Sequence, residues 1–286
     1  MMSKWFISGF ADEIDPSLDR QLEALAEFGV EWVELRAADG VNVSDFTPQK
    51  RREVREKLQA AGVRVSSIGS PIGKISLDEP FQPHMERLKR CLEAHKELGA
   101  HYLRMFSFYP PQGRAPADCR SQVLDWLGAL LDEAGRWDAV LLHENEKGIY
   151  GDTAPRCLDL LEALGSPRFR AVFDFANFLE VGQPTWEAYQ MIKPYIQYIH
   201  IKDADEEKKI VPAGQGQGRV GEILADLSAS GWEGFLSLEP HLVDFAGLAA
   251  LERDPQKRGA SMDGKTAWHT ALTALREILS TIPAAG

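Results

Sequence analysis

Residues 23–36, EALAEFGVEWVELR, place the end of an amphipathic helix, a glycine and an apolar strand in direct succession. The same unit recurs in residues 56–69, EKLQAAGVRVSSIG, and in residues 93–106, EAHKELGAHYLRMF. A glycine after a helical pattern supplies the left-handed backbone conformation that commonly closes a helix. Short strands that alternate with helices pair in parallel through right-handed crossovers. The repeat therefore predicts an α/β fold built on a parallel sheet.

Eight such strands can be traced along the 286 residues. An opening strand at Lys4–Phe10 precedes the three repeats, and the later strands are AVLLHE (139–144), FRAVFD (169–174), YIQYIH (195–200) and GFLSLE (234–239). Helical patterns lie at Pro16–Phe28, Pro48–Ala60, Gln82–Leu98, Ala117–Gly135, Ala154–Leu164, Thr185–Lys193, Gly221–Ala229 and Lys265–Ile282. Eight strand–helix units predict a (β/α)8 TIM barrel that occupies residues 1–286 as a single domain. An open doubly wound sheet is the alternative, but no glycine-rich dinucleotide loop follows the first strand.

The composition is that of a soluble globular protein without affinity for nucleic acid. Hydrophobic residues make up 44% and the formal net charge is −11, whereas binding to a phosphate backbone relies on clustered Lys and Arg. No apolar run reaches the length of a membrane span, and the N-terminal apolar stretch is too short for a signal peptide. We therefore expect a cytoplasmic protein with neither nucleic acid nor a membrane as partner. A homo-oligomer is compatible with Phe178, Trp186 and Trp232, which fit either an interface or helix packing.

Four of the predicted strands end in a side chain that can bind a metal: Glu144, Asp174, His200 and Glu239. Because the C-terminal ends of parallel barrel strands lie on one face, we expect these side chains to converge. Alternate residues of a strand face the same side, so Glu144 points inward and His143 toward the helices. Three carboxylates and one imidazole suit a divalent ion such as Mn²⁺, Mg²⁺, Co²⁺ or Zn²⁺. Solvated strand ends are the alternative, but they do not explain four such residues in succession.

Longer motifs surround these residues, namely HENEKGIYGD (143–152), VFDFAN (172–177), YIHIKDAD (198–205) and LSLEPH (236–241). Together with SGFADEI (8–14) they resemble the xylose isomerase-like TIM barrel superfamily, the sugar phosphate isomerase/epimerase group. The resemblance implies that Glu144, Asp174, His200 and Glu239 bind one divalent metal ion (Mn, Mg, Co or Zn). It also implies that Glu144 and Glu239 form the acid/base pair of an isomerase or epimerase.

These residue types suit the transfer of a proton on a carbon next to a carbonyl group. The reaction passes through an enediolate, whose negative oxygens a divalent metal can neutralise. Two carboxylates on opposite sides of the substrate remove and return the proton, and Glu144 and Glu239 are the candidates. The sequence therefore predicts a metal-dependent isomerase or epimerase that acts on a small molecule, namely a keto-sugar, a sugar phosphate or a related polyol.

Three other functions remain open at this level. A metal-dependent lyase of the inosose dehydratase kind would share the proton abstraction and expel a β-hydroxyl, with Lys202 or His241 as the acid. A barrel that binds sugar without catalysis would more readily have lost a metal ligand, and all four positions are filled here. A hydrolase like endonuclease IV needs several metals and a basic DNA surface, which seven histidines and a net charge of −11 do not favour.

Five residues near the strand ends are candidates for substrate binding: Arg104, Lys202, His241, Asn177 and Lys74. Related 3-epimerases often have a histidine where this chain has Asn177, and an arginine shortly after the strand-seven histidine, where this chain has Lys202. This departure disfavours a 3-epimerase but not a keto-sugar or polyol in general. The alternative for Arg104 is an ion pair with Glu34 or Glu144, and for Lys202 and Lys74 it is exposure to solvent.

Loops after the strands are expected to lie over the functional face, above all Tyr109–Ala117 and His241–Gly264. The stretch PAGQGQGRVG (212–221) follows the seventh strand. Its spaced glycines could let backbone N–H groups approach an anion, since barrels often bind phosphate near strands seven and eight. A flexible turn before the next helix is the alternative.

Overall fold

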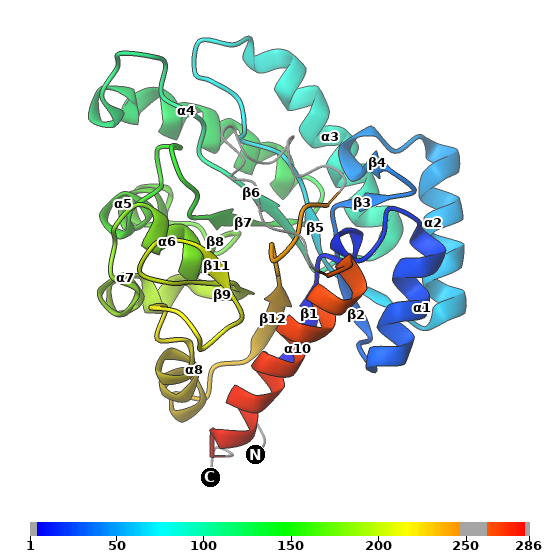
Figure 1. The fold of residues 1–286 in the computed structure, drawn as a ribbon. Coiled ribbons are helices and arrows are strands. Elements are labelled where there is room, and N and C mark those ends of the chain that lie inside the picture. The colour runs from blue at the N-terminus through cyan, green and yellow to red at the C-terminus, as the bar shows by residue number, and fades with distance from the viewer. Residues whose placement is uncertain (1–4, 246–261, 284–286) are drawn as a thin grey trace.

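The barrel is visible in the order of its strands. The computed structural model describes residues 5–245 and 262–283, and in them eight parallel strands form one sheet (Figure 1). In sheet order the strands are β1 (Trp5–Gly9), β12 (Gly234–Leu238), β9 (Ile196–Ile201), β8 (Phe169–Asp174), β7 (Val140–Glu144), β6 (Tyr102–Met105), β5 (Arg64–Gly69) and β2 (Trp32–Leu35). The last strand in the chain pairs with the first, and β1 also contacts β2, so the ring is nearly complete. The predicted (β/α)8 barrel is confirmed.

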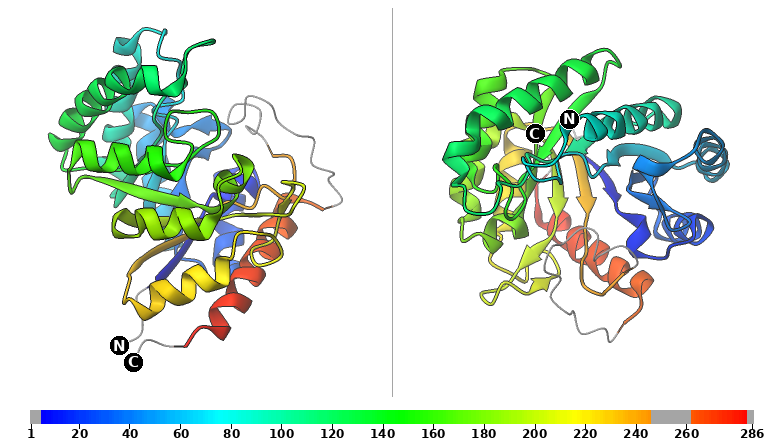
Figure 2. Two further views of the ribbon diagram at one scale, coloured as in Figure 1. Left: turned by 90° about the vertical axis from the view of Figure 1, so that its left-hand side faces the viewer. Right: turned by 90° about the horizontal axis from the view of Figure 1, so that it is seen from above.

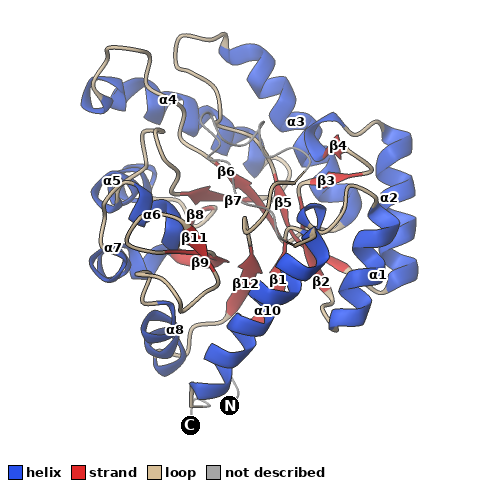
Figure 3. Ribbon diagram, viewed as in Figure 1, coloured by secondary structure: helices blue, strands red, loops and turns tan. Residues whose placement is uncertain are grey.

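Helices surround the strands on the outside (Figures 2 and 3). They are α1 (Leu18–Phe28), α2 (Pro48–Ala61), α3 (Phe81–Leu98), α4 (Pro116–Gly135), α5 (Ala154–Leu164), α6 (Phe175–Glu180), α7 (Thr185–Ile192), α8 (Val220–Ala229) and α10 (Gly264–Thr281). Eight of these match the predicted helices, with ends that differ by no more than two residues. The short helix α6 was not predicted. It begins immediately after β8, where Asp174 caps its first turn.

The glycines of the repeated unit close their helices as expected. Gly29, Gly62 and Gly99 follow α1, α2 and α3 with φ angles of 65°, 68° and 65°. These values lie in the left-handed region, which glycine adopts without a steric penalty. The chain turns at each glycine directly into the next strand, which places all strand C-termini at the same end of the barrel.

Apolar side chains fill the barrel directly beneath that end. The interior cluster consists of Trp32, Leu142, Val172, Tyr198 and Phe235, all buried. Three of them lie two residues before a predicted metal ligand on the same strand, so the ligand faces the same interior one step higher. A larger apolar core lies between the outer face of the sheet and the helices. The polar residues of the barrel mouth therefore lie next to this apolar cluster, one step closer to the C-terminal ends of the strands.

The structure also shows where the aromatic residues and the long loops singled out from the sequence lie. Phe178 is fully buried and serves helix packing, whereas Trp186 and Trp232 are partly buried and pack against the helix–sheet core. A homo-oligomer stays a prediction. The described helices include none with the length and apolar character of a membrane span. The loop Tyr109–Ala117 begins at the barrel mouth, where Tyr109 packs with Phe106. Most of the loop His241–Gly264 lies outside the described residues.

Candidate metal and catalytic site

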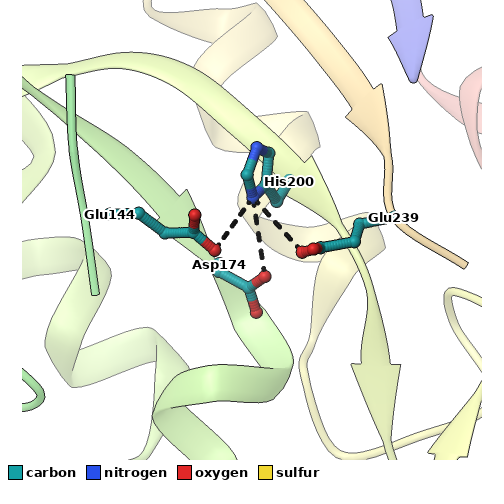
Figure 4. Close-up of side chains that lie close together, drawn as sticks. All are labelled: Glu144, Asp174, His200 and Glu239. Atoms are coloured by element: carbon teal, nitrogen blue, oxygen red, sulfur yellow. Dashed lines mark hydrogen bonds and ion pairs between the residues drawn. The ribbon is translucent and has the colours of Figure 1, made fainter. Parts of the chain in front are cut away.

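The four predicted ligands meet at the C-terminal end of the barrel (Figure 4). The Nδ1 atom of His200 lies 3.1 Å from Glu144 Oε1, 3.4 Å from Glu239 Oε2 and 3.8 Å from Asp174 Oδ2. One ligand atom from each residue lies within 4.8 Å of the other three, and all four residues are buried. Two donors on opposite sides of an ion bound at about 2.1 Å are about 4.2 Å apart, so the cluster has the size of a metal site.

Strand geometry explains why these side chains converge. Asp174 is paired with His200 across β8 and β9, and His200 is paired with Ser237 across β9 and β12. Glu144 ends β7, and Glu239 follows β12 directly. Figure 4 shows Glu144 and Glu239 on opposite sides of the His200 imidazole, with Asp174 between them. Their roles as metal ligands and as an acid/base pair stay predictions that this geometry permits.

The charge within the site favours a divalent cation. Four buried carboxylates, those of Glu34, Glu144, Asp174 and Glu239, face two permanent cations, Arg104 and Lys202. Burial alone would lower the pKa of His200, but Glu144 and Glu34 hold it well above the usual value, so without a metal the imidazolium compensates one of the negative charges. A metal ion on His200 would require the neutral imidazole, and two negative charges would then remain for the ion to compensate in a region of low dielectric constant. The buried Asp174 Oδ2 is held by an ion pair with Lys202 Nζ at 3.1 Å and lies 3.8 Å from His200 Nδ1. A buried carboxylate oxygen among other oxygen and nitrogen donors fits a metal ligand.

The site shifts the pKa values of its acids in opposite directions. Burial alone would raise the pKa of Glu144, but His200 and Arg104 outweigh it and lower the pKa to about 2. Burial likewise opposes the ionisation of Glu239, whereas Lys202 and His241 hold its pKa well below the usual value. For Asp174 burial prevails over Lys202 and raises the pKa to about 6. Both glutamates are therefore ionised at neutral pH, as an incoming cation or proton requires.

Arg104 forms the ion pair that was one of its two predicted roles. Its Nη1 donates to Glu144 Oε2 at 2.8 Å, and both side chains are buried. The guanidinium also lies over the rings of Phe10 and Phe106, at 5.1 and 4.7 Å from their centroids. Arg104 therefore fixes the orientation of Glu144. A contact between Arg104 and the substrate stays a prediction.

Lys202 does not reach solvent, so that alternative is wrong. Its Nζ lies 3.0 Å from Glu239 Oε2 and 3.1 Å from Asp174 Oδ2, and the residue is only 5% exposed. Burial alone would lower the pKa of Lys202, but Asp174 and Glu239 hold it well above the usual value. The two neighbouring strand-end carboxylates draw the ammonium group inward, where it lies beside the ligand oxygens.

The other candidates for substrate binding lie around this centre. Asn177 donates from Nδ2 to Glu144 Oε1 at 3.2 Å and to the carbonyl of Asn145 at 2.9 Å. Lys74 pairs with Glu146 at 2.8 Å, and its Nζ lies 4.4 Å from the centroid of the Phe106 ring. Asn177 thus holds Glu144 in place, and Lys74 lies beside Phe106 and Glu146. Their contacts with a substrate remain predictions.

His241 joins a second polar group that the sequence did not reveal as part of the site. Its Nε2 lies 3.3 Å from Glu239 Oε1 and 3.4 Å from Glu13 Oε1. Arg36 contacts Glu13 at 3.2 Å and Asp12 at 2.8 Å, and its Nη1 lies 3.6 Å from Glu239 Oε1. Burial raises the pKa of Glu13 to about 8 even though Arg36 opposes the shift. Arg36 already supplies the cation among these carboxylates.

One signal for this second group was present in the sequence. Arg36 stands two residues after Glu34 and continues the inward-facing side of β2, so strand alternation could have indicated it. Asp12 and Glu13 lie in the short helix η1 (Ala11–Glu13) and follow no strand period.

His143 faces outward as predicted and lies 2.9 Å from Ser107 Oγ, and burial lowers its pKa to about 4.

The glycine-rich stretch holds an anion from within the chain. The buried carboxylate of Asp203 accepts hydrogen bonds from the backbone N–H groups of Gly214, Gly216 and Gly218 at 3.0, 3.1 and 2.8 Å. It also accepts one from Ala204 at 2.9 Å. Of the two possibilities considered from the sequence, these N–H groups do approach an anion, but it is a side chain of the same protein and not a phosphate. These amides are therefore not free to bind a phosphate.

We expect Gly218→Ala to lower the free energy of unfolding by about 2 kcal/mol, a typical cost of overpacking a buried site. A Cβ atom at Gly218 would lie 2.6 Å from Asp203 Oδ1, which is held in place by its other hydrogen bonds. Gly221→Ala is the matched control, because its nearest neighbour would be 3.7 Å away and the residue lies in α8. Urea denaturation of both variants tests the prediction, and equal stabilities would contradict it.

With the fold and the site described, the chain can be assigned to a family. The family model for the xylose isomerase-like TIM barrel matches residues 22–278, and the chain belongs to this family. A relative, 2-epi-5-epi-valiolone 7-phosphate 2-epimerase from Actinoplanes sp., is 28% identical over 227 residues, which cover 75% of this chain and 79% of the relative. The 3-dehydroshikimate dehydratase from Bacillus anthracis is 21% identical over 129 residues, 45% of this chain and 46% of that protein.

A solved structure of the IOLI protein with a zinc atom has the same fold. Its TM-score is 0.74 at 16% identity, and the match covers 97% of this chain and 99% of that chain. The relatives named above are enzymes, one an epimerase and one a dehydratase. The family is thus one whose members include epimerases and lyases, and one solved structure of the same fold contains a metal.

Proposed function

We propose that the chain is a divalent-metal-dependent isomerase or epimerase acting on a keto-sugar, a sugar phosphate or a related polyol. The observation that carries the proposal is that, in each of the two glutamates, one carboxylate oxygen faces His200 and the other oxygen faces a different partner. Glu144 directs Oε1 at His200 Nδ1 and Oε2 at Arg104, at 3.1 and 2.8 Å. Glu239 directs Oε2 at His200 Nδ1 and Oε1 at His241, at 3.4 and 3.3 Å. A carboxylate that binds a metal and also moves a proton needs such a second oxygen.

The chain's own residues supply the remaining steps of the proposed reaction. Glu144, Asp174, His200 and Glu239 would hold the metal ion, which when bound supplies a positive charge that stabilises negative oxygens of the substrate. One glutamate removes the proton from the carbon beside the carbonyl, and the electrons of that C–H bond form the double bond of the enediolate. The other glutamate, which is ionised at rest, first takes up a proton from water and then delivers it to the opposite face of the enediolate, while the first glutamate releases its proton to water. Lys202 can donate a hydrogen bond or a proton to the developing oxyanion.

A lyase is the second candidate, and Lys202 is the observation that favours it. Its ammonium group lies 3.0 Å from Glu239 Oε2, so an acid stands next to a candidate base. After proton abstraction by Glu239, such an acid can protonate a leaving β-hydroxyl, which departs as water. The likeness to a dehydratase supports this alternative, as the likeness to an epimerase supports the first.

One experiment separates these functions. The metal-loaded protein is incubated in D₂O with keto-sugars, inososes and sugar phosphates, and the products are analysed by mass spectrometry and NMR. An isomerase or epimerase is expected to give a product with solvent deuterium on the carbon that exchanges its proton. Loss of one water from the substrate would identify the lyase instead. Absence of both products and of deuterium exchange, in protein whose metal content has been verified, would contradict a catalytic role.

A further inference from the structure

Glu34 is the closest partner of the His200 nitrogen that faces away from the metal position. Its Oε2 lies 3.0 Å from His200 Nε2, on the opposite side of the imidazole from Glu144. The same oxygen accepts a hydrogen bond from Ser237 Oγ at 2.7 Å. All three residues are fully buried. The two contacts show that Glu34 is oriented toward the imidazole from within the barrel and not toward solvent.

We propose that Glu34 is a positioning residue that keeps the proton of His200 on Nε2 and so leaves the lone pair of Nδ1 for the metal. The inference rests on the proposed metal site. A neutral imidazole carries one proton, and a carboxylate beside Nε2 accepts a hydrogen bond only from the tautomer with Nε2–H. The other tautomer would place the Nε2 lone pair against the carboxylate oxygen. A carboxylate in this position also increases the basicity of the ligating nitrogen.

The surroundings prevent the imidazole from turning away from this arrangement. The ring of Phe10 meets it edge-on, with centroids 5.4 Å apart and an interplanar angle of 72°. The ring of Tyr198 meets it at 5.9 Å and 81°. Both rings are fully buried, so a rotation of the His200 side chain would require the core to move.

A network of hydroxyl groups inside the barrel holds Ser237, the residue that donates a hydrogen bond to the Glu34 carboxylate. The hydroxyl of Tyr198 lies 2.8 Å from Ser66 Oγ, which lies 2.6 Å from Ser8 Oγ and donates to the carbonyl of Val33 at 3.1 Å. Tyr198 also hydrogen-bonds Ser237, the residue that donates to Glu34. The polar network inside the barrel therefore leads from its middle to the histidine, and Glu34 is the member that contacts the ring.

The competing explanation is that Glu34 only balances the charge of Arg104. Burial alone would lower the pKa of Arg104, and Glu34 is one of the carboxylates that raise it. Two substitutions separate the explanations. Glu34→Gln removes the charge but keeps a neutral acceptor for Nε2–H, whereas Glu34→Met removes both at similar length. A role in charge balance predicts equal effects of Gln and Met. A role in positioning His200 predicts a graded loss, with Met more severe than Gln.

The test measures the dissociation constant for Zn²⁺ and Mn²⁺ by chelator competition in the folded variants. We expect Glu34→Gln to weaken metal binding by about 10-fold and Glu34→Met by about 100-fold, the range found for partners of ligating histidines. Ser237→Ala, which removes one hydrogen bond from Glu34 and leaves the contact with His200, is expected to have a smaller effect than either. Should Glu34→Met fail to fold, the remaining test is whether Glu34→Gln weakens metal binding more than Ser237→Ala does.

A second measurement reports on the tautomer directly. In the zinc-loaded wild type, ¹⁵N NMR is expected to show a protonated, slowly exchanging Nε2 of His200, and in Glu34→Gln this proton should exchange faster. Equal zinc affinity of Gln, Met and wild-type proteins, or a wild type that binds no divalent metal, overturns the inference. A wild type that binds metal with the expected graded losses, but converts no substrate, refutes the proposed function and leaves the inference intact.

Discussion

Glu239→Gln is expected to lower kcat by about 1,000-fold, within the range of about 100- to 10,000-fold attributed to a general acid or base. A neutral amide cannot accept the substrate proton, and Oε2 of Glu239 also lies at the predicted metal position, 3.4 Å from His200 Nδ1. Turnover of the best substrate found in the D₂O screen, measured at saturating metal, tests this expectation. Saturation matters because the substitution also weakens a predicted ligand.

The matched control for this substitution is Glu233→Gln. Glu233 is an exposed glutamate just before β12, at the opposite end of the strand from Glu239. We expect its kcat to equal that of the wild type, because the side chain lies outside the barrel mouth. Turnover of Glu239→Gln near the wild-type level, with a full complement of metal, would rule out Glu239 as a member of the acid/base pair.

Removal of the metal is expected to abolish turnover and to lower the midpoint of thermal unfolding. A ligand present at 100 times its dissociation constant stabilises the folded state by about 2.7 kcal/mol. The buried carboxylates make the metal-free state costly, as the pKa of Asp174 near 6 indicates. Differential scanning calorimetry with and without a chelator, and with Mn²⁺ added back, measures both the loss and its recovery.

Asp174→Asn provides the internal comparison for metal removal. The amide oxygen of Asn can still cap α6, as Asp174 Oδ1 does for the N–H of Asn177, but the position of Oδ2, which faces His200, is then taken by an NH2 group that cannot bind a metal. We therefore expect its unfolding temperature to respond little to metal or to chelator. An unfolding temperature of the wild type that is insensitive to both would contradict the proposed metal site.

The four strand-end residues were predictable because a strand imposes a simple rule on its side chains. Alternation fixes the side to which Glu144 or His200 points, and parallel pairing puts all strand ends on one face. The side-chain contacts between strands that are distant in the sequence were harder to predict. Glu34 was considered as a possible ion-pair partner of Arg104 but not of His200, because His200 lies far along the chain and only the closed barrel brings the two together.

The missed features have a different physical origin. Asp12 and Glu13 belong to a short 3₁₀ helix, and their role follows from Arg36, which lies on another strand. No periodicity marks such a contact. For Lys202 the sequence left a place in the site and exposure to solvent both open, because its position depends on the summed charge of Asp174 and Glu239. Sequence patterns report the backbone, whereas the direction of a long charged side chain is decided by the field around it.

The Asp203 carboxylate has a consequence for how the barrel can select among substrates. It is covalently part of the loop whose amides it binds, so its effective concentration is in the millimolar range or higher and it competes with any free phosphate. A phosphate on a substrate would therefore have to be bound by groups other than these three amides. In the proposed reaction, selection among substrates would then depend on the hydroxyl groups that face Glu144, Glu239 and Lys202.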